Sequence, residues 1–307
     1  MTSRRSLFTL LGVVLMMMLL AITGASNQNS KNNRNNKNSK NNRNNKNNDD
    51  HDDHIKKIIS TVRECYNRSA IKREGQRSST PRYSHNKGDS LVKMFDAIDD
   101  IDIAQMVTLS DCIKIADPTR FEDRKFDQNA NKYGGGNDVI YLTGLMPLIT
   151  PSLSRYLLEV ASAAAEEAGW RPHISHLGIR CIEKLQYHPG GELLYHTDHG
   201  SVYTLVLVFS DETEYIGGEF QIKNADRSII NHKAPRFGGM LFDSIKDHGI
   251  TTIKEGERHV LVIEFWPYED TNVKDRRPHE VRHNFQAKLP KLLEVSTEHY
   301  CPSKVDT

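Results

Sequence analysis

The sequence has neither a strong net charge nor paired cysteine motifs. Its 41 Lys and Arg residues against 40 Asp and Glu residues leave a formal net charge of +1, so the chain exerts no global attraction on nucleic acid. The four cysteines, Cys65, Cys112, Cys181 and Cys301, form no CxxC pair, which argues against a structural zinc site. Their even number permits disulfides, but the spacing does not assign the pairs. Cys181 lies in a predicted core strand, 174–187, so we predict a small buried thiol there rather than half of a bridge.

A phosphate-binding loop is missing as well. Gly134-Gly135-Gly136 is a glycine run, but it lacks the preceding strand and following helix that a phosphate loop requires. We therefore expect a flexible loop at these residues.

Long apolar runs are confined to the N-terminus. Residues 7–22 are uncharged and apolar, follow Arg4 and Arg5, and lead into small residues up to Ala25, a pattern typical of a secretory signal over residues 1–25. The run approaches the roughly 20 residues that span a bilayer, so a retained signal-anchor is the alternative. Basic residues without acids follow it, which opposes a type II orientation and favours cleavage. We expect the mature chain in the secretory pathway (endoplasmic reticulum or Golgi lumen, or secreted), with membrane attachment only if the segment is retained.

Residues 26–54 offer no core. Residues 26–48 form an Asn/Lys/Arg-rich tract with an internal repeat and no apolar side chain, so nothing offsets the entropy of ordering it and a disordered spacer is predicted. A nucleic-acid-binding arm is the functional alternative, which secretion argues against. The acidic, His-containing stretch 49–54 is typical of a solvated charge run.

Residues 55–136 are predicted to be a helical and loop segment. Ile55, Ile58, Ile59 and Val62 have helical spacing, which predicts a short amphipathic helix. We expect a loop over 70–90, a helix over 91–98, and the opening of the folded domain at 106–115. Asn67-Arg68-Ser69 is an N-glycosylation sequon, which gains meaning beside a secretory signal.

Residues 137–267 are predicted to form the main domain, mainly β with flanking helices (α+β). After a strand at 137–143, Thr150 is expected to cap a helix with Pro151 in its first turn and Gly169 at its end. Its buried stripe is expected to contain Leu153, Leu157, Val160, Ala161 and Ala164. Further strands are predicted at 174–187, 203–209, 219–222, 240–242, 250–253 and 259–265. Many short strands in series after a helix favour a double-sheet jelly roll. Residues 268–307 form a polar C-terminal extension, with a short helix expected at 289–295.

Three side chains in the β-rich part are candidates for a metal site. His196 and Asp198 stand two positions apart, a spacing that places side chains on one face of a strand. His248 is the natural third ligand, because two His and one carboxylate leave the opposite coordination positions open, as suits Fe(II) enzymes that use O2. A lone His is more often a core or surface residue. We therefore predict core or surface roles, and no metal binding, for His173, His176, His188, His199, His232 and His259. The triad differs because an Asp flanked by apolar strands needs a compensating cation.

Two further residues accompany the candidate triad. Arg258 follows His248 by ten residues and opens an apolar strand, where an inward guanidinium needs an anion and can clamp a carboxylate with two hydrogen bonds. A surface ion pair with Glu255 or Glu257 is the alternative for Arg258. Tyr187 precedes His196 by nine residues, and a buried Tyr hydroxyl needs a partner.

Together, these residues resemble the iron- and 2-oxoglutarate-dependent dioxygenases, in particular the prolyl 4-hydroxylase-like branch. The resemblance rests on His196-x-Asp198, His248, Arg258, Tyr187 and a Gly217-Gly218-Glu219-Phe220 turn, and it extends over about 173–266. It implies a double-stranded β-helix with Fe(II) on the triad and 2-oxoglutarate held by Arg258 and Tyr187. It also implies O2 as the oxidant and L-ascorbate as a supporting reductant. Two positions depart from collagen-type enzymes, which carry Lys at Arg258 and Tyr at Leu193.

The resemblance leaves the substrate open. The implied reaction is hydroxylation of an unactivated C–H bond, with a prolyl or other residue of a protein or peptide as the expected substrate. The same chemistry on a small molecule and a non-catalytic, cupin-like metal-binding module are the alternatives. The Arg258 and Tyr187 pair favours an enzyme, because a passive barrel needs no clamp for a dicarboxylate.

Overall fold

The computed structural model describes residues 37–77, 79–86, 89–124 and 134–267. Outside the described residues lie the predicted signal at 1–25, the C-terminal extension with its expected helix at 289–295, and Cys301. The chain divides into two compact units, Met1–Asp52 and Asp53–Thr307, and the described part of the first is the beginning of a helix. No helix within the described ranges is long and apolar enough to cross a membrane.

The helices account for the first part of the chain and for the segment before the main strands. They are α2 (Lys37–Ser69), α3 (Asp100–Ala116), α4 (Met146–Ile149) and α5 (Pro151–Glu167), with short 3-10 turns η1 (Pro118–Arg120) and η2 (Ile174–His176). The predicted apolar stripe of α2 is confirmed, since Ile55, Ile58, Ile59 and Val62 are all buried. The helix is longer than expected, because it begins at Lys37, within the tract that we predicted as a disordered spacer. Helical hydrogen bonds are local, so a polar segment can extend a helix whose apolar part is anchored.

A disulfide between Cys65 and Cys112 joins α2 to α3, at a sequence separation of 47. Cys181 is buried and forms no disulfide with another described residue, as predicted. The described N-terminal elements are therefore covalently tied to one another at a point where both helices contribute to the same core cluster.

The fold is mainly antiparallel β, curled into a jelly roll. The main sheet runs in the order β1-β2-β10-β6-β13-β5-β11-β8-β9, with β4 also pairing with β5 and β3 with β4. Its strands are β1 (Arg82–Ser84), β2 (Leu91–Phe95), β3 (Phe121–Arg124), β4 (Gly134–Tyr141), β5 (Leu177–His196), β6 (Tyr203–Val208), β8 (Phe220–Lys223), β9 (Ile229–His232), β10 (Gly239–Asp243), β11 (Asp247–Ile250) and β13 (Arg258–Pro267). A small second sheet pairs β7 (Tyr215–Gly217) with β12 (Ile253–Gly256).

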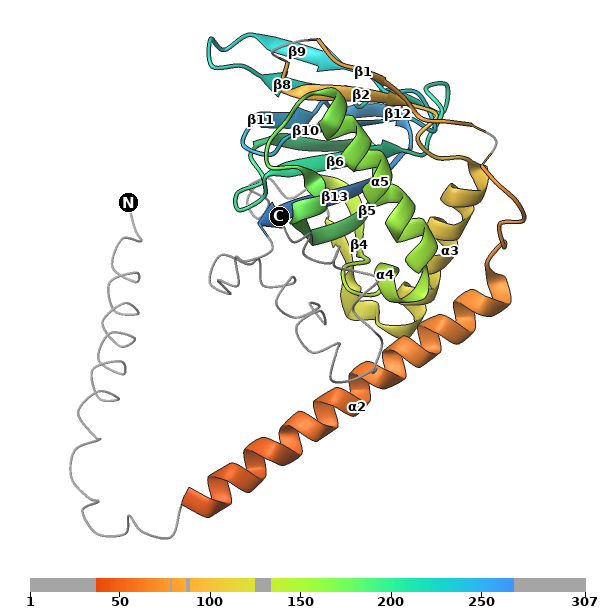
Figure 1. The fold of residues 1–307 in the computed structure, drawn as a ribbon, viewed down its shortest axis with the longest axis vertical. Helices are drawn as coiled ribbons and strands as arrows, with labels where there is room; N and C mark the ends of the chain where they lie inside the picture. The colour runs from red at the N-terminus through yellow and green to blue at the C-terminus, as the bar shows by residue number, and fades with distance from the viewer. Residues whose placement is uncertain (1–36, 78, 87–88, 125–133, 268–307) are drawn as a thin grey trace, which may run out of the picture. The chain divides into compact units, whose positions relative to one another are not determined.

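Alternation along the central strands separates two cores. Leu205, Leu207 and Leu241 point to the helix side and belong to one cluster with α3 and α5, which lie against the sheet in Figure 1. Val206 and Phe242 point the other way and meet side chains of β8, β11 and β12. The inner face of the curled sheet therefore encloses a second core, and the candidate site residues belong to this face.

Helix α5 confirms most of its predicted features. All five residues of the expected stripe are buried, Pro151 is its first residue, and Gly169 follows its end with a φ of 65°. The capping role of Thr150 was wrong. Its Oγ1 donates to Met146 O at 2.9 Å, the carbonyl that also accepts the Thr150 main-chain N–H, so the hydroxyl does not cap the first turn of α5.

The expected glycine loop at 134–136 was also wrong, because these residues begin β4. A Cβ on Gly134 would lie 2.6 Å from Glu192 O, and one on Gly136 would lie 2.6 Å from Gly191 Cα. The glycines therefore permit a close approach of β4 to β5, which a local sequence pattern does not reveal.

Two other predictions were corrected by strand pairing. Residues 91–98 contain β2 rather than a helix, since β2 pairs with β1 on one side and β10 on the other. The expected strand 250–253 is divided, because Ile250 ends β11 while Ile253 begins β12 in the other sheet. In both cases tertiary hydrogen bonding decides the local structure.

Candidate metal centre and anion pocket

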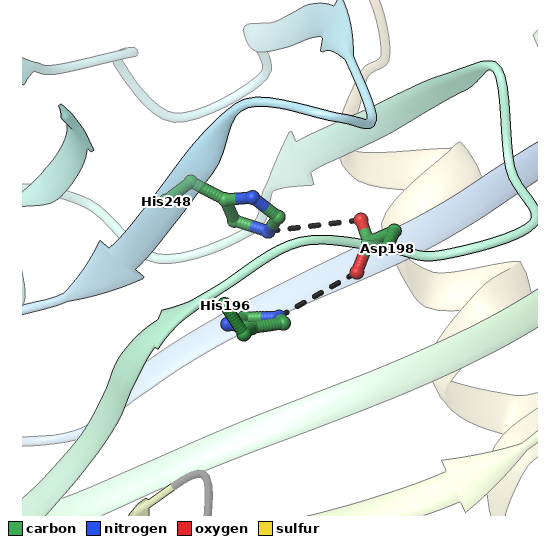
Figure 2. Close-up of side chains that lie close together, drawn as sticks. All are labelled: His196, Asp198 and His248. Atoms are coloured by element: carbon green, nitrogen blue, oxygen red, sulfur yellow. Dashed lines mark ion pairs between the residues drawn. The ribbon is translucent and has the colours of Figure 1, made fainter. Parts of the chain in front are cut away.

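The structure brings His196, Asp198 and His248 together. His196 is the last residue of β5, and its pairing partner in the neighbouring strand β11 is His248. Asp198 lies just beyond the end of β5, so a turn rather than the alternation of one strand carries its side chain to the histidines. One ligand atom from each of the three residues lies within 4.8 Å of the others, and the three side chains converge in Figure 2.

Both imidazoles are oriented by main-chain carbonyls. His196 Nδ1 lies 2.9 Å from Leu194 O, and His248 Nδ1 lies 2.9 Å from Lys246 O. A carbonyl only accepts, so each Nδ1 carries a proton, and Nε2 is the ring nitrogen left to bind a metal when it is not protonated. The two Nε2 atoms lie 3.5 Å and 3.6 Å from the two carboxylate oxygens of Asp198. The arrangement directs three donor atoms at one point.

The protonation states of the triad suit a cation. Burial raises the pKa of Asp198, but the hydrogen bond from His196, the two histidines' charges and the Thr204 hydroxyl together hold it well below its usual range. Burial lowers the pKa of His248, outweighing the attraction of Asp198. Burial also opposes protonation of His196, yet its bond to Asp198 leaves the His196 pKa raised. The positive charge that Asp198 attracts is then a proton on His196, and a metal ion at Nε2 would replace this proton. An ionised carboxylate and two imidazole nitrogens form the donor set that Fe(II) oxygenases use, so the residues fit this metal.

Thr204 is a site residue that sequence reasoning missed. Its Oγ1 donates to Asp198 Oδ2 at 2.6 Å and lies 2.8 Å from Ser244 Oγ. Thr204 faces the cavity from β6, a strand that the sequence pattern predicts only as apolar. Its contact with Asp198 fixes one carboxylate oxygen while the other remains directed at His196.

Arg258 and Tyr187 form a second polar group in the same cavity. They are directly paired on β13 and β5, and Arg258 Cζ lies 5.7 Å from the centroid of the Tyr187 ring. Their exposures are only 3% and 2%. Arg258 Nε is buried without a hydrogen-bond partner, and among the described residues no carboxylate pairs with this guanidinium. The alternative surface pair is not formed, because Glu257 contacts His188 and Gln186 instead.

Asn137 completes this group from β4 and was also missed from the sequence. It is paired with Tyr187 in the sheet and its side chain hydrogen-bonds the Tyr187 hydroxyl. Burial raises the pKa of that hydroxyl, against the opposing charge of Arg258, so Tyr187 is a neutral donor. A buried cation beside a neutral hydroxyl donor, with no carboxylate of the described residues paired to the guanidinium, has the chemistry to accept an anionic ligand.

One cavity of about 460 Å³ contains both groups. Apolar side chains line the space between them. Charged side chains lie at both ends, since Arg124 pairs in the sheet with Asn137, the neighbour of Tyr187, and Glu264 lies near the end of β13. The apolar lining includes Leu185, Val206, Phe220, Phe242, Ile250 and Val260, and the charged lining includes Arg124, Arg180, Glu183 and Glu264. The position of Glu264 could have been predicted from the sequence. Every second residue of a strand shares a face, so Glu264 faces the cavity together with Arg258, Val260 and Val262.

Comparison with known proteins finds similarity only in the overall structure. No family model matches the chain, and no curated protein matches it. A Burkholderia pseudomallei oxidoreductase of the 2OG-Fe(II) oxygenase family is 14% identical with a TM-score of 0.45, covering 58% of this chain and 86% of its own. A Pseudomonas putida prolyl-4-hydroxylase is 12% identical with a TM-score of 0.42, covering 58% and 93%. A Trichoplax adhaerens prolyl hydroxylase, in complex with a hypoxia inducible factor peptide fragment, is 12% identical with a TM-score of 0.40, covering 69% and 92%.

Proposed function

We propose that the protein is an Fe(II)- and 2-oxoglutarate-dependent dioxygenase. The observation that carries this proposal is the buried, anion-deficient Arg258 in the same cavity as the His-Asp-His group. A passive metal-binding barrel accounts for the three ligands but gives no reason for a buried guanidinium with an unpaired Nε. Burying an unpaired cation is costly, by several kcal/mol, so its presence favours a ligand that carries a carboxylate.

The roles of the residues follow from their places in the cavity. His196, Asp198 and His248 would hold Fe(II), which supplies the activation of O2 coupled to decarboxylation of 2-oxoglutarate. Arg258 and Tyr187 would bind the distal carboxylate of 2-oxoglutarate by charge-assisted hydrogen bonds. The apolar wall formed by Leu185, Val206 and Val260 keeps bulk water from the space between the two polar groups. The chain's contribution is thus to position the reactants and to exclude side reactions.

We further propose that the substrate is a prolyl or other residue of a protein in the secretory pathway. The cavity falls within the roughly 300–1,000 Å³ of small-ligand sites, so it accommodates the cosubstrate and a single side chain presented by an extended segment. The Cys65–Cys112 disulfide supports an oxidising compartment. L-ascorbate is expected to sustain turnover.

The direct test is release of succinate by the purified protein. Fe(II), 2-oxoglutarate and a panel of proline-containing peptides would be supplied together, and each omitted in turn. The proposal expects succinate that depends on all three, with a mass increase of one oxygen in the accepted peptide. Succinate stimulated by small molecules but by no peptide would favour the small-molecule alternative. Metal binding without any 2-oxoglutarate binding would favour the passive module.

A further inference from the structure

A buried ion pair lies at the end of the cavity away from Arg258. Arg180 on β5 and Glu264 on β13 have side chains that are each 4% exposed, and Arg180 Nη1 lies 3.1 Å from Glu264 Oε2. Both side chains line the cavity. Glu264 pairs in the sheet with Cys181 on one side and with Thr204, the residue that contacts Asp198, on the other.

The pair binds the turn that follows β5. Arg180 Nη1 donates to the carbonyl of His199 and, at 3.0 Å, to Ser201 Oγ. Ser201 Oγ in turn donates to Glu264 Oε2 at 2.6 Å. Gly200 lies between these two contacts with a φ of +85°, a conformation that favours glycine. Residues 199–201 are therefore held on the ion pair by hydrogen bonds on both sides of this glycine.

The same turn carries Asp198. Ser201 N donates to Asp198 O at 3.0 Å, and Asp198 N donates to Ser244 O at 3.0 Å. Ser201 therefore links Asp198 to the ion pair through hydrogen bonds. Asp198 is not held by strand pairing, because β5 ends at His196.

Stability alone is a poor explanation for this ion pair. Removing two charges from water costs several kcal/mol per ion, and well-packed apolar residues often serve the fold equally well. The pair instead brings one charged nitrogen, Arg180 Nη1, within hydrogen-bond reach of a carbonyl and a hydroxyl of the same turn.

We propose that Arg180 and Glu264 are positioning residues that set the affinity of the metal centre by holding the Asp198 turn. This inference rests on the proposed function, because it requires a metal at the triad. Residues that orient metal ligands typically change metal affinity by about 10- to 100-fold when altered. We expect that range for Arg180→Lys, which keeps the charge but has a shorter side chain that does not bring its ammonium to the position of Nη1, and for Ser201→Ala, which removes the hydroxyl that joins the turn to the pair.

A matched control exists elsewhere in the described chain. Arg120 is also fully buried, pairs with Asp117 at 3.1 Å, and donates to the carbonyls of Tyr141 and Thr143. It is not among the residues that line the cavity. Arg120→Lys therefore disturbs a buried arginine with a comparable set of contacts, without touching the Asp198 turn.

The experiment measures Mn(II) binding to the full chain by titration calorimetry, with thermal unfolding recorded for each variant. We expect Arg180→Lys and Ser201→Ala to bind Mn(II) about 10- to 100-fold more weakly than the wild type. Arg120→Lys should keep the wild-type affinity for Mn(II), even if its unfolding temperature falls by as much as that of the two turn variants. Unchanged affinity in both turn variants, or an equal loss in Arg120→Lys, overturns the positioning role while leaving the proposed function standing. Wild-type protein whose Mn(II) binding is absent, or insensitive to His248→Ala, overturns both.

Discussion

Replacing Arg258 with Met should separate binding of the cosubstrate from stability of the fold. The wild-type guanidinium is 3% exposed and its Nε has no partner. An unsatisfied buried donor costs about 1–3 kcal/mol, so Arg258→Met should stabilise the protein in the absence of 2-oxoglutarate. This expectation is opposite in sign to the usual effect of a core substitution.

Binding of 2-oxoglutarate should become weaker in Arg258→Met. Removing one partner of a buried charge pair costs about 3–5 kcal/mol, and ~1.4 kcal/mol corresponds to a factor of ten. The requirement for 2-oxoglutarate should therefore rise by roughly two to three and a half orders of magnitude. Fe(II) affinity should stay nearly constant, since Arg258 contacts none of the three ligands. Arg258→Lys should lose less, because it keeps a charge at this position.

Succinate production at varied 2-oxoglutarate and varied Fe(II) measures the two dependences separately, and thermal unfolding of the metal-free protein measures stability. Arg120→Met is the control, because Arg120 is equally buried but paired with Asp117, so its loss should destabilise. The reasoning about the anion pocket is refuted if Arg258→Met keeps the wild-type dependence on 2-oxoglutarate. It is also refuted if that variant loses stability as Arg120→Met does.

Four other outcomes are expected. Alanine at any one of the three triad positions should abolish Fe(II)-dependent turnover while circular dichroism stays unchanged; full activity at saturating Fe(II) would remove that residue from the metal site. Reducing the Cys65–Cys112 disulfide, which closes a loop of 47 residues, should cost up to about 4 kcal/mol by loop entropy, and an unaltered denaturant midpoint would contradict this. Burial opposes ionisation of Asp99, but its hydrogen bond from Arg73 leaves its pKa lowered, so its contribution to stability is full above the ordinary carboxyl pKa and is lost as pH falls through the lowered value. Asp99→Asn should therefore flatten the acid limb of the stability curve, and an unchanged slope would count against the pair. A reporter fused after residue 30 should enter the secretory pathway, and cytosolic retention would exclude the signal.

The parts of the site that depend on local spacing could be predicted from the sequence. His196 and Asp198 are close in the chain, and the ten residues from His248 to Arg258 suffice for the chain to leave β11 and enter β13. The jelly roll could be predicted because the central strands β6 and β13 contain apolar runs that are buried on both faces, so their burial does not depend on the exact register.

The remaining parts depend on contacts between distant segments. Arg180 and Glu264 are 84 positions apart, and their pairing requires the register of β5 against β13. Asn137 becomes a site residue only because β4 pairs with β5 opposite Tyr187. Strands β2 and β9 are short, and β2 forms because β10 offers it an edge. No local pattern contains such information.

The close approach of β4 to β5 also limits how the cavity can diversify. Gly134 lines the cavity, and main-chain atoms rather than side chains surround the space where its Cβ would lie. We therefore expect no single substitution at Gly134 to be tolerated, since any side chain would separate β4 from β5. Leu193 and Thr197 line the same cavity and are half-buried, so their side chains can change without moving the backbone. Variation in substrate preference among descendants of this sequence, natural or engineered, is expected at these two positions and not along the glycine-lined wall.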